Sequence, residues 1–200
     1  KMKKLSLVFI FFIFIFKTLP AYTYSSDPQT FVTELVNDAI SKLADKNISE
    51  EKKKEFIEKI AIENVDINAL GLYTLGEIRK STEKDVLLKF QESFKEYFLK
   101  SLTSRLTDYS ENKFEVISAD KKSVNYTIVK SKILESENQP EIKIDWRVYT
   151  KNPDKPLIRD LIVEGLSLAR TQKEEFSSIL SSNNNDINIL ISKLNEFVDK

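Results

Sequence analysis

Apolar residues recur every three or four positions through much of the first half of the sequence, a spacing that is typical of amphipathic helices. Asp27 followed by Pro28 has the form of an N-cap and a first helical residue, and Ser49 with the glutamates behind it starts a second such pattern. The apolar positions of the two patterns are Phe31, Val32, Leu35, Val36, Ala39, Ile40 and Leu43, and then Phe56, Ile57, Ile60 and Ala61. Two consecutive helices are therefore predicted.

Two glycines, Gly71 and Gly76, interrupt the next helical pattern, which covers residues 65–80. A glycine costs a helix up to about 1 kcal/mol relative to alanine, so we expect close packing, a kink or a ligand near the backbone there. A long helix is predicted from residue 83 to about residue 107. Its inner stripe, Leu87, Phe90, Phe94, Tyr97, Phe98 and Leu102, is mainly aromatic, as in a protein core.

After Ser110 the hydrophobic period changes to two, which predicts strands. Four such runs, 113–119, 123–133, 141–151 and 157–165, are separated by short turn-forming segments, which favours an antiparallel meander. In the third run Ile142, Ile144, Trp146 and Val148 share one face. Beyond Gly165 the helical spacing returns. We therefore expect an α+β fold, in which N-terminal helices pack on a curved antiparallel sheet of about four strands with C-terminal helices.

Residues 1–26 are predicted to be a signal peptide and a short leader, and residues 27–200 a single domain. Lysines precede an apolar run over residues 5–16, which is shorter than the roughly 20 apolar residues that a spanning helix needs. No clear cleavage motif is present, so the processing site is placed near residues 21–26. The alternative is an uncleaved N-terminal anchor.

Composition narrows the chemistry that is open to the chain. It contains no cysteine and no histidine, which excludes the usual zinc ligands, a cysteine nucleophile and a histidine-based triad. Removing residues 1–21 takes four lysines and no acidic residue, so that 27 basic residues face 31 acidic ones in the remainder. A mildly acidic protein is a poor partner for nucleic acid. We predict no catalytic residue, no cofactor and no metal.

Three stretches, residues 69–102, 144–180 and 186–194, resemble in this order the MlaC or toluene-tolerance family of periplasmic phospholipid-binding proteins. The most specific piece is the family's V-E-G-x-S-L, at whose places stand Val163, Glu164, Gly165, Ser167 and Leu168. By this resemblance, Gly165 marks the bend where the last strand leaves the sheet for the C-terminal helices. Where the family usually has glycines before the final helix, this chain has three asparagines, which tolerate left-handed backbone well.

The resemblance implies a fold related to nuclear transport factor 2, with an apolar cavity between helices and sheet. It also implies a carrier that shuttles a diacyl phospholipid between the outer and inner membranes and supports outer-membrane lipid asymmetry. The implied partners are an inner-membrane ABC lipid transporter complex and an outer-membrane lipoprotein. A monomer in the periplasm of a Gram-negative bacterium is expected.

The candidate lipid-binding residues are apolar or aromatic and come from three parts of the chain. They are Leu72, Tyr73 and Leu75 beside the glycines, Phe90, Phe94, Tyr97 and Phe98 on the long helix, and Tyr126, Ile128, Ile144, Trp146, Val148 and Leu161 on the sheet. Periodicity does not separate a cavity lining from an ordinary core. Arg147 and Arg159 are candidates for a phosphate at the cavity mouth, although strand arginines are more often solvated.

Two other functions remain open at this point. One is a small-molecule isomerase or dehydratase on a related fold, with Asp145, Asp160 or Glu164 as base and Tyr126 or Tyr149 as hydrogen-bond donor. The other is an interaction module that has no cavity.

The N-terminal assignment predicts that the mature protein begins between Tyr22 and Asp27 and is soluble. N-terminal sequencing of the protein recovered after export checks this. Protein in the membrane pellet that still carries residues 5–16 would contradict it.

Overall fold

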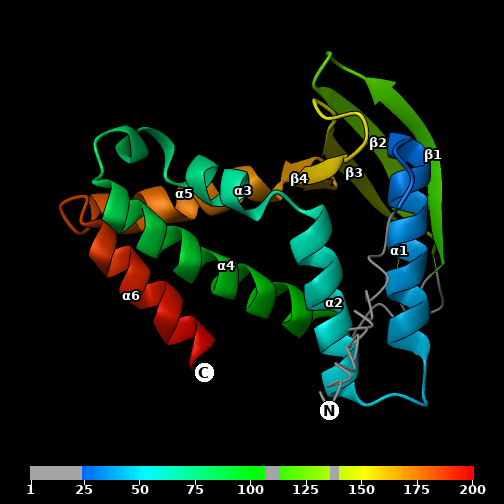
Figure 1. Cartoon of the computed structure of the whole chain (residues 1–200), viewed down its shortest axis with the longest axis horizontal. Coiled ribbons are helices and arrows are strands. Elements are labelled where there is room, and N and C mark those ends of the chain that lie inside the picture. Colours follow the sequence, from blue (N-terminus) through cyan, green and yellow to red (C-terminus); the bar gives the residue numbers. More distant parts are fainter. Residues whose placement is uncertain (1–23, 107–112, 136–139) are drawn as a thin grey trace, which may run out of the picture.

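The structure is a computed structural model that describes residues 24–106, 113–135 and 140–200. Two helices precede the main helical group, a sheet follows, and two helices close the chain (Figure 1). The elements are α1 (Pro28–Ala44), α2 (Glu50–Asn64), α3 (Ile67–Thr74), the 3-10 helix η1 (Gly76–Lys80), α4 (Lys84–Leu106), β1 (Phe114–Lys121), β2 (Tyr126–Ile133), β3 (Ile142–Tyr149), β4 (Leu157–Val163), β5 (Leu166–Ser167), α5 (Leu168–Ser181) and α6 (Ile187–Val198). The predicted α+β fold is confirmed.

The helix starts follow from local capping chemistry. The Asp27 carboxylate accepts hydrogen bonds from the backbone N–H of Thr30, at 2.9 Å, and from its hydroxyl, at 2.8 Å. These bonds favour the ionised carboxylate and hold the pKa of Asp27 below its ordinary value. Ser49 caps α2 in the same way, accepting from the Lys52 N–H. Both predicted N-caps are confirmed.

The strands form one antiparallel sheet in the order β1-β2-β3-β4-β5. Its inner face, defined here as the face that carries Trp146 and Val148, packs under α1 through Phe31 and Val32. The residues opposite Trp146, Val129 on β2 and Leu161 on β4, lie on the same face. The other face is called the outer face. It carries ion pairs such as Lys130 with Asp120, as expected of a solvated surface.

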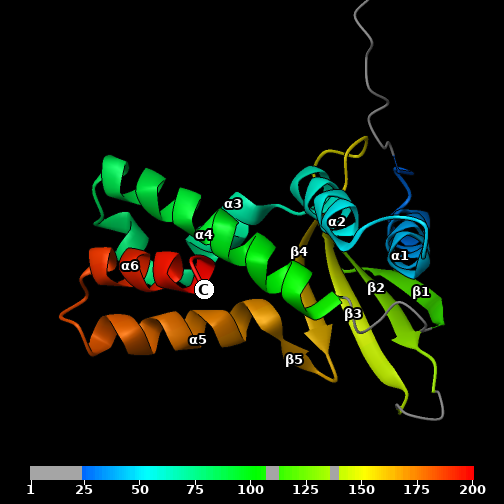
Figure 2. The same ribbon diagram turned by 90° about the horizontal axis from the view of Figure 1, so that it is seen from below.

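Apolar side chains form two main clusters, one on each side of β4. The helical cluster joins α3, α4, α5 and α6 around Phe90, Phe94 and Phe176. The sheet cluster joins α1 to the inner face. Val65, between α2 and α3, packs against both clusters. Figure 2 shows the helical group extending away from the sheet on the β4 side.

The sheet has five strands rather than about four, because the chain turns back after β4 and adds the two-residue strand β5. The loop residues Glu164 and Gly165 have φ values of 49° and 83°, and Val163 pairs with Leu166. Two positive φ values in a two-residue loop are those of a type I′ hairpin. The expectation that the chain leaves the sheet at Gly165 is therefore wrong. It leaves after β5.

Glycine is required at the other two positions, 71 and 76, for different structural reasons. A Cβ on Gly71 would lie 2.8 Å from Cδ1 of Phe94, so glycine lets α3 approach α4 closely. Gly76 has φ of 58° and is the first residue of η1, directly after Leu75, the C-cap of α3. Asn184 and Asn185 adopt φ of 54° and 59°, so the turn before α6 is left-handed as expected.

Of the helices that the structure describes, none has both the length and the apolar character needed to span a membrane. The apolar run at residues 5–16 lies outside the described residues.

The hairpin geometry predicts the effect of replacing Gly165. A Cβ there would meet no atom within 4 Å, so any loss of stability comes from the φ of 83° and not from a clash. Gly165→Val should lower the free energy of unfolding by more than about 1 kcal/mol. Gly165→Asn should cost clearly less, because asparagine tolerates this backbone. Chemical denaturation measures both, and equal losses would contradict the backbone explanation.

Candidate functional site

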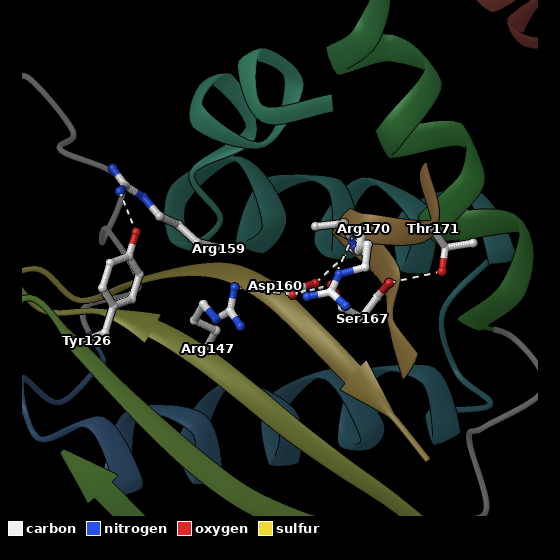
Figure 3. Close-up of polar contacts among 8 residues, drawn as sticks. Tyr126, Arg147, Arg159, Asp160, Ser167, Arg170 and Thr171 are labelled. Carbon is white, nitrogen blue, oxygen red and sulfur yellow. Dashed lines mark hydrogen bonds and ion pairs between the residues drawn. The ribbon is translucent and has the colours of Figure 1, made fainter. Parts of the chain in front are cut away.

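Two consecutive residues of β4, Arg159 and Asp160, hold the starts of two helices. In the register between β3 and β4, Arg147 lies opposite Asp160 and the next residue, Val148, lies opposite Ile158. Arg159 therefore has no partner on β3 and is an extra residue in the ladder, as in a β-bulge. The bulge re-aims the two side chains. Figure 3 shows Arg159 directed toward Tyr126, and Asp160 directed toward Ser167 and α5.

Asp160 anchors α5 through its carboxylate. The residue is buried, with 3% of its surface exposed. One oxygen accepts from the Ser167 hydroxyl at 2.6 Å, and the other accepts from the Ala169 N–H at 3.0 Å. Ser167 in turn accepts from the Arg170 N–H and so caps α5. Arg147 adds an ion pair at 3.8 Å. The carboxylate is therefore fully used in holding the β5–α5 junction.

Arg159 anchors the start of α3. Its guanidinium donates to the Asp66 carboxylate at 2.8 Å and to the Tyr126 hydroxyl at 2.9 Å, and it lies 3.4 Å from the ring centroid of Tyr149. Partial burial opposes the charge, but the hydrogen bonds to Tyr126 and Asp66 outweigh it and raise the pKa of Arg159. Asp66 is also the N-cap of α3. Of the two arginines considered for a phosphate, Arg159 is thus occupied, and Arg147 is the more exposed.

One end of the inner face is only partly covered. There the register places Ile133 opposite Ile142, Ile144 opposite Val163, and Val163 opposite Leu166. The first four are half-buried and Leu166 is 69% exposed, whereas Val148 at the other end is fully buried. We call these five residues, Ile133, Ile142, Ile144, Val163 and Leu166, the apolar end of the inner face. It offers hydrocarbon contact without a fixed polar partner.

The structure does not bring the thirteen candidate lipid-binding residues together in one place. Leu75, Phe90, Phe94, Tyr97 and Phe98 belong to the helical cluster, whereas Ile144, Trp146, Val148 and Leu161 belong to the sheet cluster. On α3, Leu72 is half-buried and Tyr73 is 41% exposed. The register places Tyr126 and Ile128 on the outer face, opposite Tyr149 and Arg147. That these thirteen residues bind lipid stays a prediction.

Four residues of the apolar end, Ile133, Ile142, Val163 and Leu166, are not among the candidates. Strand alternation carried a signal for two of them, since Ile142 shares a face with Ile144 and Val163 shares a face with Leu161. Ile133 and Leu166 could be placed only once the strands were paired.

A pocket of about 790 Å³ opens at a different place, between the end of α3, η1 and the start of α4 on one side and α5 with the start of α6 on the other. Leu75, Ile78 and Leu180 contribute apolar surface, and Glu77 and Lys173 contribute charge. Its volume is ordinary for a small-molecule site. Only Leu75 of the candidate residues lines it. Within the described residues no group of acidic side chains could hold a metal ion.

Comparisons with known proteins give one family match and one structural match. A family model described as MlaC protein matches residues 33–196. A solved structure, that of the phospholipid-binding protein from Ralstonia solanacearum in complex with a phospholipid, matches with a TM-score of 0.71 at 17% identity. The match covers 84% of this chain and 94% of that one, and it shows a shared fold. A search of curated proteins gives no match.

The anchoring role of Asp160 predicts a large loss of stability when its carboxylate is removed. Asp160→Ala leaves the Ser167 hydroxyl and the Ala169 N–H without their acceptor. The free energy of unfolding should fall by at least about 2 kcal/mol, because an unsatisfied buried donor costs about 1–3 kcal/mol. Asp145→Ala, on the outer face of the neighbouring strand, is the matched control and should cost under about 1 kcal/mol. Similar losses for the two variants would show that Asp160 is not an anchor.

Proposed function

The chain belongs to the MlaC family, and on that premise we propose that it binds a phospholipid whose acyl chains cover the apolar end of the inner face. The observation that carries this proposal is the partial exposure of adjacent apolar side chains at one end of a face whose centre, at Val129, Trp146 and Val148, is buried. The neighbour of the same fold was solved with a phospholipid, which supports the class of ligand.

Acyl chains account for the strength of such binding. Each methylene removed from water stabilises by roughly 0.8 kcal/mol, so two exposed chains would cost on the order of 20 kcal/mol. A carrier must hide most of that surface and still release the lipid to a bilayer. Contacts with Ile142, Ile144 and Val163 contribute to both needs, since they shield part of the acyl surface from water and fix no polar group.

The finer proposal is a shuttle for a diacyl phospholipid between the outer and inner membranes. In this role the chain is the soluble component of an ABC-type transport system in the periplasm of a Gram-negative bacterium, as a monomer. An inner-membrane transporter complex and an outer-membrane lipoprotein would be its partners. Support comes from the family and from the signal-like pattern of residues 1–26.

Two observations weigh against a carboxylate-dependent isomerase or dehydratase. Asp160 already accepts hydrogen bonds from Ser167 and Ala169, which leaves it no role as a free base. Tyr126, a proposed donor, is bound by Arg159. An interaction module without a cavity would carry no lipid, so the test below separates it from a carrier.

Purified protein should contain a diacyl phospholipid. Denaturing extraction followed by mass spectrometry should recover it at a defined ratio to the protein. Protein that is folded by circular dichroism and free of phospholipid, and that takes up none from vesicles, would contradict the proposal.

Neighbouring residues of β4 give a matched pair of variants. Val163 lies on the inner face, opposite Ile144, and Ile162 lies on the outer face, opposite Asp145; both are half-buried. Val163→Asn would place an unpaired amide against hydrocarbon, which costs about 1–3 kcal/mol, so retained phospholipid should fall at least about fivefold. Ile162→Asn should retain lipid as the unaltered protein does. Equal retention by the two variants would place the acyl chains elsewhere.

A further inference from the structure

Two leucines, Leu166 on β5 and Leu168 at the first position of α5, are exposed to solvent where the β4–β5 hairpin leads into the helix. Leu166 is 69% exposed and Leu168 is 48% exposed. Leu166 pairs with Val163, which pairs with Ile144, so Leu166 forms the exposed edge of the apolar end, and Leu168 follows it two residues later along the chain. A single exposed leucine on a protein surface needs no explanation, but this pair extends the surface to which the acyl chains are assigned.

The two leucines are held in place by the fold. The Glu164 N–H donates to the Lys143 carbonyl, and the Lys143 N–H donates to the Glu164 carboxylate. On the other side of Leu166, Ser167 is bound to the buried carboxylate of Asp160. The hairpin therefore presents Leu166 and Leu168 on a short, well-anchored projection.

A lipid that enters or leaves through water would expose its acyl chains at a high cost. This cost is avoided when the edge of the acyl-binding surface touches the bilayer during transfer. Two positive and two negative side chains near the hairpin balance, namely Lys143 and Arg170 against Asp145 and Glu164, and the charge of Arg147 is paired with that of the buried Asp160. Such a surface fits the zwitterionic interface of a phospholipid bilayer, and it gives no reason to prefer an anionic one.

We propose that the β4–β5 hairpin is a membrane-contact site, at which Leu166 and Leu168 insert into the interface of a zwitterionic phospholipid bilayer while lipid passes between bilayer and inner face. This inference rests on the proposed function and adds the place at which the lipid crosses.

The test compares transfer rate with lipid content in the processed, lipid-loaded protein. In Leu166→Ser/Leu168→Ser, transfer of a fluorescent phospholipid to phosphatidylcholine vesicles should slow at least about tenfold when the rate is expressed per bound lipid, because Leu166 itself belongs to the apolar end and its loss also lowers the amount of lipid held. Leu88→Ser is the matched control, because Leu88 on α4 is 54% exposed, and it should transfer at the unaltered rate. Circular dichroism verifies folding, and Leu168→Ser, at a residue outside the apolar end, serves alone if the double variant unfolds.

Three outcomes would overturn the inference. Full transfer rate in the lipid-loaded double variant would remove the hairpin from the transfer step and leave lipid binding intact. A rate that rises steeply with anionic lipid and falls with salt would replace hydrophobic insertion by charge attraction. Absence of lipid from every variant, the unaltered protein included, would remove the proposed function and this inference together.

Discussion

The arrangement of the molecule depends on a bulge in β4 that sends two adjacent charged side chains to two different helices. Arg159 holds Asp66 at the start of α3, and Asp160 holds Ser167 and Ala169 at the start of α5. Helix starts are suitable anchor points because their first N–H groups lack partners within the helix. The helical group is thereby fixed to the sheet by polar contacts at the N-terminal ends of α3 and α5. Val65 adds an apolar contact between the two clusters.

Because polar anchors attach the helical group beside the sheet, one part of the inner face stays free for a ligand. The polar groups of β4 are committed to the anchors, and the helices α3 to α6 form a cluster of their own. The apolar end, from Ile133 to Leu166, is consequently neither fully packed nor polar. A protein that binds hydrocarbon reversibly needs such a surface, because a completed core would leave no room and a polar one would repel the chains.

Much of the fold could be predicted because its signals are local. Asp27 and Ser49 cap helices through neighbours three residues away, and the alternation from Ile142 to Val148 needs only the strand itself. β5 was missed because a two-residue strand has no period. Gly165 was correctly seen as a special position, but its role in a hairpin becomes clear only from the φ of Glu164 beside it.

The site was harder to predict because it depends on pairing between distant segments. Phe90 and Trp146 give the same apolar signal in the sequence, yet they belong to different clusters. Tyr126 lies on the outer face because of its register with Tyr149, which no strand reveals alone. The β4 bulge also has a consequence for how the family can vary in length. Deleting Arg159 would return β4 to a regular ladder, and inserting a residue before Leu161 would turn that side chain to the outer face. Length changes should therefore collect in the connections between strands, and β4 should keep its residue count.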